Sequence, residues 1–474
     1  MIDEATGTFT ERLSNFALGH FSIPQAVSRH AKRVLLDALG LAIAGTTAKE
    51  AQALSETMRS VGGSAEATAI GCDVKLPAGS AVLVNASLIH ASDFDDTHIE
   101  SVCHVGPCIA PVALAMAERT GANGAKMLAA FILGGEVMIR VGLVGGSGLA
   151  RAGYHPTGYC GAFGATAAAA ILLGLTRDEL TNAFGIVATF ASGSSAYLPN
   201  GASTKRLHPA WAGHSGIMAA LFAKAGLTGP RTAIEGPFGL LPVRLRASEY
   251  NNAMLKSPVD PDFRFPQIAF KKYPVSHIIA AYIDAIFELK ARHGINERNV
   301  LRVVCHVHPD AARTVFKPEA ERRRPSSSFS AKFSLPFAIA LALHRQLIGQ
   351  HDFDDASRDE DILCTSDKVF CAEDSTLDFP RHLPARVDVA TTDGNTHSIA
   401  IEYPEGTPEN PMTDGQIGDK FLLNTKPVLK SATAETLMSR LLDIEQIEDI
   451  SADIMRLTRP EIALPRAANG EAVR

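Results

Sequence analysis

Small apolar residues fill long stretches with helical spacing across most of the first 265 residues. Pro24 opens one of them, and further Ala- and Gly-rich stretches follow at 78–92, 108–120, 124–142, 161–174, 177–192 and 209–226. Helices with such small side chains can pack very close together, and a helical period does not suit a strand. The pattern therefore predicts a buried bundle of helices.

Helix start and stop signals separate these stretches. Thr176 followed by Glu179 is the pattern of a capping box, which marks a helix N-terminus. Gly121, Gly174 and the run 226–230 stand where helices are expected to end.

The pattern changes after about residue 268. Residues 299–308 alternate with a strand period, and residues 386–402 form a predicted hairpin around Asp393-Gly394, with predicted helices at 276–292 and 333–348. Residues 414–457 return to a helical pattern. We therefore expect a mainly α fold, in which 1–268 and 405–474 form a large all-helical domain and 269–404 forms a smaller α+β domain.

Charge and cysteine content exclude several classes of protein. With 45 Lys+Arg against 51 Asp+Glu the net charge is -6, which gives no general attraction to nucleic acid or to anionic membranes. The seven cysteines are scattered without a CxxC pair, as in a reducing compartment, and the N-terminus is acidic and polar, unlike a signal peptide. Apolar runs such as 333–343 stop short of the roughly 20 residues of a membrane helix. A cytoplasmic protein is expected.

The first candidate site is the segment His90-Ala-Ser-Asp93-Phe-Asp95-Asp96-Thr97-His98, followed by His104. Neighbouring carboxylates and imidazoles shift one another's pKa values, which acid–base chemistry uses. A helix end with solvated acids explains the same residues equally well. The string DFDD recurs at 352–355 in a stretch dense with acids, where we expect a solvated acidic loop.

Three further clusters are candidates for binding an anion. Residues 200–208 place Lys205 and His208 in a Gly/Ser/Thr turn before a predicted helix, where backbone N–H groups favour an anion, although an ordinary basic turn is the alternative. Lys271 and His277 lie at the predicted domain boundary, a preferred place for ligands, although solvated charges of a linker are the alternative. His155 lies in a loop, where a lone histidine is usually structural.

One segment invites a metal interpretation. His306, His308 and Asp310 lie in the sequence HVHPD, but no other ligand cluster is evident nearby, so a metal hydrolase is a distant alternative.

Taken in order, several motifs resemble the MmgE/PrpD family. They are HASDFDDTH (90–98), HPTGYCGAFGATAAAAILLGL (155–175), TKRLHPAWAGHSGIMAALFAKAGLTGP (204–230), IEGPFGL (234–240), FKKYP (270–274) and FSLPF (333–337). The family includes 2-methylcitrate dehydratase, cis-aconitate decarboxylase and iminodisuccinate epimerase. The resemblance implies a helical domain built from both ends of the chain, an α+β lid, a homodimer, and no metal or other cofactor.

The resemblance also implies the site residues. His104, Asp93, Lys205 and Lys271 match family positions, and we expect them to be catalytic. His104 would transfer the proton, and Asp93 would orient His104 or act as the partner acid or base. The lysines would stabilise developing negative charge.

Other positions are expected to bind substrate: Thr97, His155, His208 and His277. Phe337 stands where the family often has a tyrosine.

The resulting functional hypothesis is an enzyme that transfers a proton next to a carboxylate of a small di- or tricarboxylate. A hydro-lyase similar to 2-methylcitrate dehydratase is the first reading. A decarboxylase or epimerase is the alternative, and a non-catalytic carboxylate-binding protein is more distant.

Overall fold

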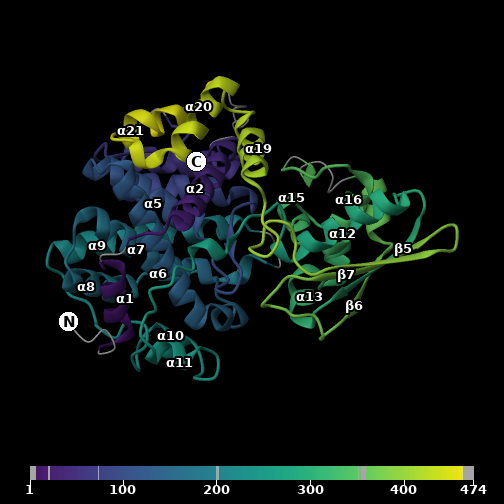
Figure 1. Ribbon diagram of the computed structural model, residues 1–474, viewed down its shortest axis with the longest axis horizontal. Helices are drawn as coiled ribbons and strands as arrows, with labels where there is room; N and C mark the ends of the chain where they lie inside the picture. Colours follow the sequence, from purple (N-terminus) through teal and green to yellow (C-terminus); the bar gives the residue numbers. More distant parts are fainter. Residues whose placement is uncertain are drawn as a thin grey trace, which may run out of the picture.

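The chain folds into two unequal parts, a large helical body and a smaller part with a sheet (Figure 1). The computed structural model describes residues 7–19, 22–72, 74–198, 202–350, 352–353 and 359–462. Helices dominate and the sheets are small, which confirms the expected mainly α fold with a smaller α+β part.

The helical body contains every long helix predicted from the Ala-rich stretches. Its main helices are α1 (Phe9–Ala17), α2 (Gln25–Gly45), α3 (Lys49–Val61), α4 (Ala78–Ile89), α5 (Gly106–Thr120), α6 (Gly124–Arg151), α7 (Pro156–Leu173), α8 (Arg177–Val187), α9 (Leu207–Lys224), α19 (Asp414–Thr425), α20 (Ser431–Leu442) and α21 (Ile450–Asp453). The capping box of Thr176 and Glu179 is present at the start of α8, as predicted. Gly121 and Gly174 end α5 and α7 in the left-handed conformation, also as predicted.

The smaller part is built on a four-stranded sheet. Its strands are β5 (Val300–Val307), β6 (Val369–Glu373), β7 (Ala385–Thr391) and β8 (Thr396–Ile401), in the order β6-β5-β7-β8. β7 and β8 form the hairpin predicted around Asp393-Gly394. Helices α12 (His277–His293) and α16 (Leu335–His344) match the two helices predicted between the strands.

Two separate hydrophobic cores underlie these parts. The first core draws on residues between Phe9 and Phe270 and again between Met412 and Met455, so both ends of the chain pack into it. The second core lies between Tyr273 and Val389. The chain crosses from one core to the other next to β4 (Ile268–Ala269), which pairs with β3 (Thr97–His98).

Some predictions need correction. Between α9 and β4 the chain forms only the short helices α10 (Leu240–Arg244) and α11 (Asn252–Lys256), because the Gly- and Pro-rich sequence there cannot sustain long ones. Strand β6 was not predicted, because its sequence VFCAE has no clear alternation. The Pro-, Ala- and Gly-rich tail from 459, for which the sequence predicts disorder, is described only as far as residue 462.

The sequence analysis also underestimated the length of the apolar helices. Helices α6 and α7 are both long and apolar enough to cross a membrane, but 89% of the apolar window of each is buried inside the protein. Helices that are apolar all round and covered by their neighbours are core helices.

Candidate active site

The segment after α4 carries the centre of the site. Helix α4 ends at Ile89, a single 3-10 turn follows over His90–Ser92, and Asp93 then adopts a left-handed backbone conformation with φ 56°. Aspartate tolerates that conformation better than most residues, and such positions cluster at functional sites. The turn aims the Asp93 side chain into the protein, where it is buried.

Asp93 is held between two buried lysines. Lys205, from the 3-10 turn Ser203–Arg206, donates a hydrogen bond to Asp93 Oδ1, and Lys271 Nζ lies 3.3 Å from the same oxygen. Burial alone would raise the pKa of Asp93, but Lys205 and then Lys271 outweigh it and hold the pKa well below its ordinary value. One carboxylate between two ammonium groups leaves a net positive charge, which suits an anionic ligand.

Lysines also fix the backbone of this segment. The carbonyl oxygens of three successive residues each accept a hydrogen bond from a lysine: Ser92 from Lys332 at 2.8 Å, Asp93 from Lys271 at 2.7 Å and Phe94 from Lys420 at 2.9 Å. These lysines come from three distant stretches of the chain. The segment is therefore the place where the two hydrophobic cores and the C-terminal helices meet.

A second group of residues surrounds His104. Its Nδ1 faces the Asp95 carboxylate at 2.9 Å, the Asp96 carbonyl oxygen at 2.8 Å and Thr97 Oγ1 at 3.4 Å. A carbonyl oxygen can only accept, so Nδ1 carries the hydrogen and Nε2 is the atom left for proton transfer. With 12% of its side chain exposed, His104 is more accessible than Asp95 behind it.

Asp95 also binds a second histidine. His90 Nδ1 lies 2.9 Å from Asp95, and both side chains are fully buried. Burial lowers the pKa of His90 to about 4, with Asp95 opposing the shift. Burial raises the pKa of Asp95, but His90 and His104 more than offset that and leave it well below the ordinary value.

Asp96 plays a structural part in the same segment. Its carboxylate accepts hydrogen bonds from Val105 N–H at 3.0 Å and Gly106 N–H at 2.9 Å, at the first turn of α5. A Cβ on Gly106 would lie 2.1 Å from Asp96 Oδ1, so only glycine allows this approach. Burial and the neighbouring Asp95 raise the pKa of Asp96 to about 8.

Three more predicted residues line the same region. His155, at the start of α7, shares a hydrogen bond with His208 of α9, with the two Nδ1 atoms 3.0 Å apart. Burial and then Lys205 lower the pKa values of both histidines. His277 begins α12 and is buried, and after burial Lys271 and His104 contribute most to lowering its pKa to about 3.

The structure thus brings together all eight residues named from the sequence. Sequence reasoning did not name Asp95 and His90 as site residues, although both lie in the quoted motif, because spacing alone does not show which acid faces which imidazole. It also missed Tyr197, whose ring centroid lies 6.1 Å from that of His155 and 5.9 Å from that of His208. No motif surrounds Tyr197.

Other candidate positions lie elsewhere. Phe337 is buried in the second core, where it packs against Phe353 with ring centroids 6.2 Å apart. His306 pairs with Asp388 across the sheet at 2.7 Å, and His308 caps α13 (Pro309–Val315). The two histidines of HVHPD therefore have separate structural partners. Asn200 and Gly201, expected to belong to the anion-binding turn, lie outside the described residues.

A cavity of about 300 Å³ lies next to this site but is distinct from it. Among its lining residues are His98, Gln267 and Tyr403, and none of the eight predicted residues. Thr97 and His98 are neighbours in β3, so their side chains point to opposite faces. The ribbon of β3 and β4 therefore separates the cavity from His104.

Comparison with known proteins identifies the family of this chain. The MmgE/PrpD N-terminal domain matches residues 11–253, and the MmgE/PrpD C-terminal domain matches residues 273–444. The cis-aconitate decarboxylase of Homo sapiens is 26% identical over 95% of this chain and 94% of its own length, and that of Aspergillus terreus is 25% identical over 92% and 93%. The 2-methylcitrate dehydratase of Escherichia coli (strain K12) is 22% identical over 60% of this chain and 61% of its own length. On the match of both domain models, this chain belongs to the MmgE/PrpD family.

Proposed function

We propose that the protein is a lyase that acts on a small di- or tricarboxylate and transfers a proton at a carbon next to a carboxylate. The observation that carries this proposal is the buried Asp93 between Lys205 and Lys271, close to a histidine with a defined free nitrogen. A homodimer, expected from the resemblance, belongs to the same proposal, and light scattering of the purified protein measures it.

The lysines are suited to binding and to charge stabilisation. A substrate carboxylate that enters the site can share Lys205 and Lys271 with Asp93, and each charge-assisted hydrogen bond contributes about 1.5–3 kcal/mol. When negative charge develops on that carboxylate, the same ammonium groups stabilise it, as donors in an oxyanion hole do. His155 and His208, which bond each other, add hydrogen-bond donors or acceptors to the site.

His104 is suited to the proton transfer. The Asp96 carbonyl keeps the hydrogen on Nδ1, and the Asp95 carboxylate 2.9 Å away stabilises the imidazolium form, as the aspartate of a Ser-His-Asp triad does. Nε2 can then remove or deliver a proton at the substrate carbon.

The same residues can serve decarboxylation or dehydration. In decarboxylation the electron pair of the broken C–C bond stays on the carbon skeleton, is delocalised onto a remaining carboxylate and takes up one proton from His104. In dehydration His104 removes the proton, hydroxide leaves the adjacent carbon, and protonated His104 returns the proton to it to give water.

Of the two, we propose decarboxylation first. The relatives named cis-aconitate decarboxylase align over almost the whole chain, whereas those named 2-methylcitrate dehydratase align over 60% of it. The dehydratase expected from the sequence is the second candidate, because its relatives share the family and part of the alignment.

Proton NMR in D₂O tests both reactions together. The purified protein is incubated with cis-aconitate, 2-methylcitrate, citrate, malate and iminodisuccinate, and each spectrum shows alkene formation, loss of CO₂ or exchange of a C–H for deuterium. We expect turnover of at least one polycarboxylate, with cis-aconitate the first candidate.

Matched lysine variants show whether the site is responsible. Lys205→Ala should abolish turnover, whereas Lys317→Ala, which removes an exposed lysine paired with Glu373, should leave it unchanged. No turnover of any of these acids by the folded protein would contradict the proposal and favour a carboxylate-binding protein, which a thermal shift with the same acids would detect.

A further inference from the structure

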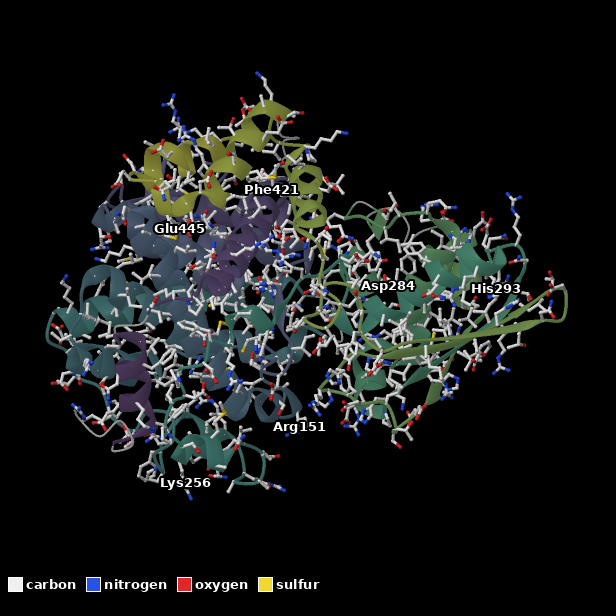
Figure 2. The ribbon with its side chains drawn as sticks, in the orientation of Figure 1. Arg151, Lys256, Asp284, His293, Phe421 and Glu445 are labelled. Atoms are coloured by element: carbon white, nitrogen blue, oxygen red, sulfur yellow. The ribbon has the colours of Figure 1, made fainter. Side chains whose placement is uncertain are left out.

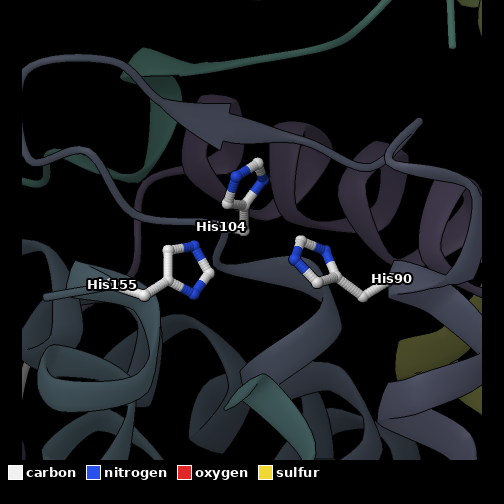
Figure 3. Close-up of side chains that lie close together, drawn as sticks. All are labelled: His90, His104 and His155. Atoms are coloured by element: carbon white, nitrogen blue, oxygen red, sulfur yellow. The ribbon is translucent and has the colours of Figure 1, made fainter. Parts of the chain in front are cut away.

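Three histidines from separate elements converge on one point. His90 follows α4, His104 precedes α5 and His155 begins α7, and Figure 3 shows their rings facing one another. One ring nitrogen from each lies within 4.8 Å of the other two. The ring centroids are 4.9, 6.0 and 6.1 Å apart.

Each ring already uses its other nitrogen. Nδ1 of His90 bonds Asp95, Nδ1 of His104 donates to the Asp96 carbonyl, and Nδ1 of His155 bonds His208. Within the described part of the chain, none of the three Nε2 atoms makes a hydrogen bond to a protein group. His90 Nε2 is buried and has no hydrogen-bond partner within the described part of the chain, although a buried polar nitrogen normally has one.

This arrangement has the features of a metal site with a prepared outer shell. Histidines that bind a metal usually donate their second ring N–H to a carboxylate, which fixes the tautomer and makes the free nitrogen a better ligand. Asp95 accepts such a bond from His90 and lies 2.9 Å from Nδ1 of His104, whose hydrogen goes to the Asp96 carbonyl. Lys205 donates to Asp93, which offsets part of the charge that this lysine presents to the imidazoles.

We propose that His90, His104 and His155 form a Zn²⁺ site with three imidazole ligands and a fourth position open to water or a carboxylate. Zinc binds histidine nitrogen at about 2.0–2.1 Å in tetrahedral geometry, so the nitrogens of a loaded site lie about 3.3 Å apart. One ring nitrogen of each histidine lies within 4.8 Å of the others, so the rings must turn toward the ion for it to bind all three.

Zinc in this site acts as an inhibitor and not as a cofactor. It occupies Nε2 of His104, the atom assigned to proton transfer, and its open position attracts the carboxylate that Lys205 and Lys271 would otherwise bind. This consequence rests on the proposed function. The binding of zinc itself does not, so the two can fail independently.

The first test measures zinc binding without any turnover. Protein freed of metal with a chelator is titrated with Zn²⁺ in competition with a chromophoric chelator, and the absorption spectrum of a Co²⁺-loaded sample reports the geometry. We expect one Zn²⁺ per chain and the strong visible bands of tetrahedral Co²⁺. No binding above that of a control protein, or the weak bands of octahedral Co²⁺, would overturn the proposal without requiring any variant to fold.

Variants then assign the ligands. Asp95→Asn, which removes the shared outer-shell carboxylate, should weaken zinc binding by about 10–100-fold. His104→Ala and His155→Ala remove a ligand each and should weaken it more. The control is His293→Ala, because His293 stacks on His397 at 4.2 Å far out on the smaller part of the protein (Figure 2) and has no place in the cluster.

The pattern across these variants is decisive. If the affinity of His104→Ala and His155→Ala for zinc equals that of the unmodified protein, or if His293→Ala loses the zinc, the site lies elsewhere and the proposal is wrong. A substrate such as cis-aconitate should change the apparent zinc affinity only if the proposed function also holds.

Discussion

The string DFDD occurs twice in this chain, at 93–96 and at 352–355, and the two copies show what a short sequence does and does not determine. The phenylalanine behaves alike in both. Phe94 and Phe353 are buried, and a lysine ammonium lies over each ring, that of Lys420 at 3.9 Å from the centroid and that of Lys332 at 5.9 Å.

The first aspartate behaves differently in the two copies. Asp93 is buried between two lysines, whereas the Asp352 side chain is 30% exposed, lies 3.6 Å from Arg345 and accepts a hydrogen bond from Gly349 N–H. The expectation of a solvated acidic loop is met only in part: Asp352 is partly exposed, but Phe353 is buried and both residues are helical. Asp354 and Asp355 lie outside the described residues.

The difference comes from residues distant in sequence. Lys205 lies 112 residues from Asp93 and Lys271 lies 178 residues from it, and no local pattern predicts that both reach the same carboxylate. The local string thus determines that its apolar side chain is buried. The fold determines whether the acidic residues beside it are buried and paired with charged groups of a site.

The largest difference between the two copies of the string is expected in kcat. Asp95→Asn removes the charge that stabilises a protonated His104, and we expect kcat to fall by about 10²–10⁴-fold, the range for a general acid or base and its orienting carboxylate. The measurement is kcat against pH with the substrate found by NMR, since a purely structural defect would not alter the shape of the pH profile. A fall of less than tenfold would remove Asp95 from the proton-transfer group.

The next effect concerns stability. Asp93→Asn leaves Lys205 and Lys271 buried without a countercharge, and removing one partner of a buried ion pair costs about 3–5 kcal/mol. Urea denaturation followed by circular dichroism measures the change in the free energy of unfolding. A loss below about 1 kcal/mol, the level of an exposed pair, would mean that water already screens Asp93.

The sequence predicted the helical body well, because its helices are long and strongly periodic. Helix α7, for example, is bounded by Pro156 and Gly174, both strong local signals. Prediction from the sequence failed for short strands such as β6, which depend on pairing with β5 rather than on their own pattern.

The site was predictable only in part for the same reason. The resemblance supplied Asp93, His104 and Lys205, which lie in recognisable motifs. Tyr197 and the sharing of Asp95 by two histidines follow from packing between distant elements, which no spacing reveals.

A smaller effect is expected on the pH dependence of stability, and it differs between Asp93 and Asp96 of the first copy. The pKa of Asp93 is lowered from 3.8, so its contribution to stability is complete above that pH and is lost only as the pH falls below it. The pKa of Asp96 is raised to about 8, so the folded protein holds a proton that the unfolded chain releases, and stability falls as the pH rises from 3.8 toward 8.

Asp96→Asn removes that dependence on pH, because an amide does not titrate but still accepts hydrogen bonds at the start of α5. The free energy of unfolding of Asp96→Asn relative to the unmodified protein should therefore rise between pH 5 and pH 8, by at most about 1.4 kcal/mol per pH unit. The same difference for Asp93→Asn should stay constant over this range. A constant difference for both variants would show that Asp96 is ionised throughout.

The smallest effect is expected in the second copy. Asp352→Asn weakens one partly exposed contact with Arg345, and such pairs contribute about 0–1 kcal/mol. The amide oxygen can still accept the hydrogen bond from Gly349, so we expect a change in the free energy of unfolding of at most 1 kcal/mol, and an unchanged kcat. Urea denaturation and the turnover assay, run beside Asp93→Asn, measure both. A stability loss as large as that of Asp93→Asn would mean that the second copy also holds a buried charge, and the contrast between the two copies would then rest on Asp95 and His104 alone.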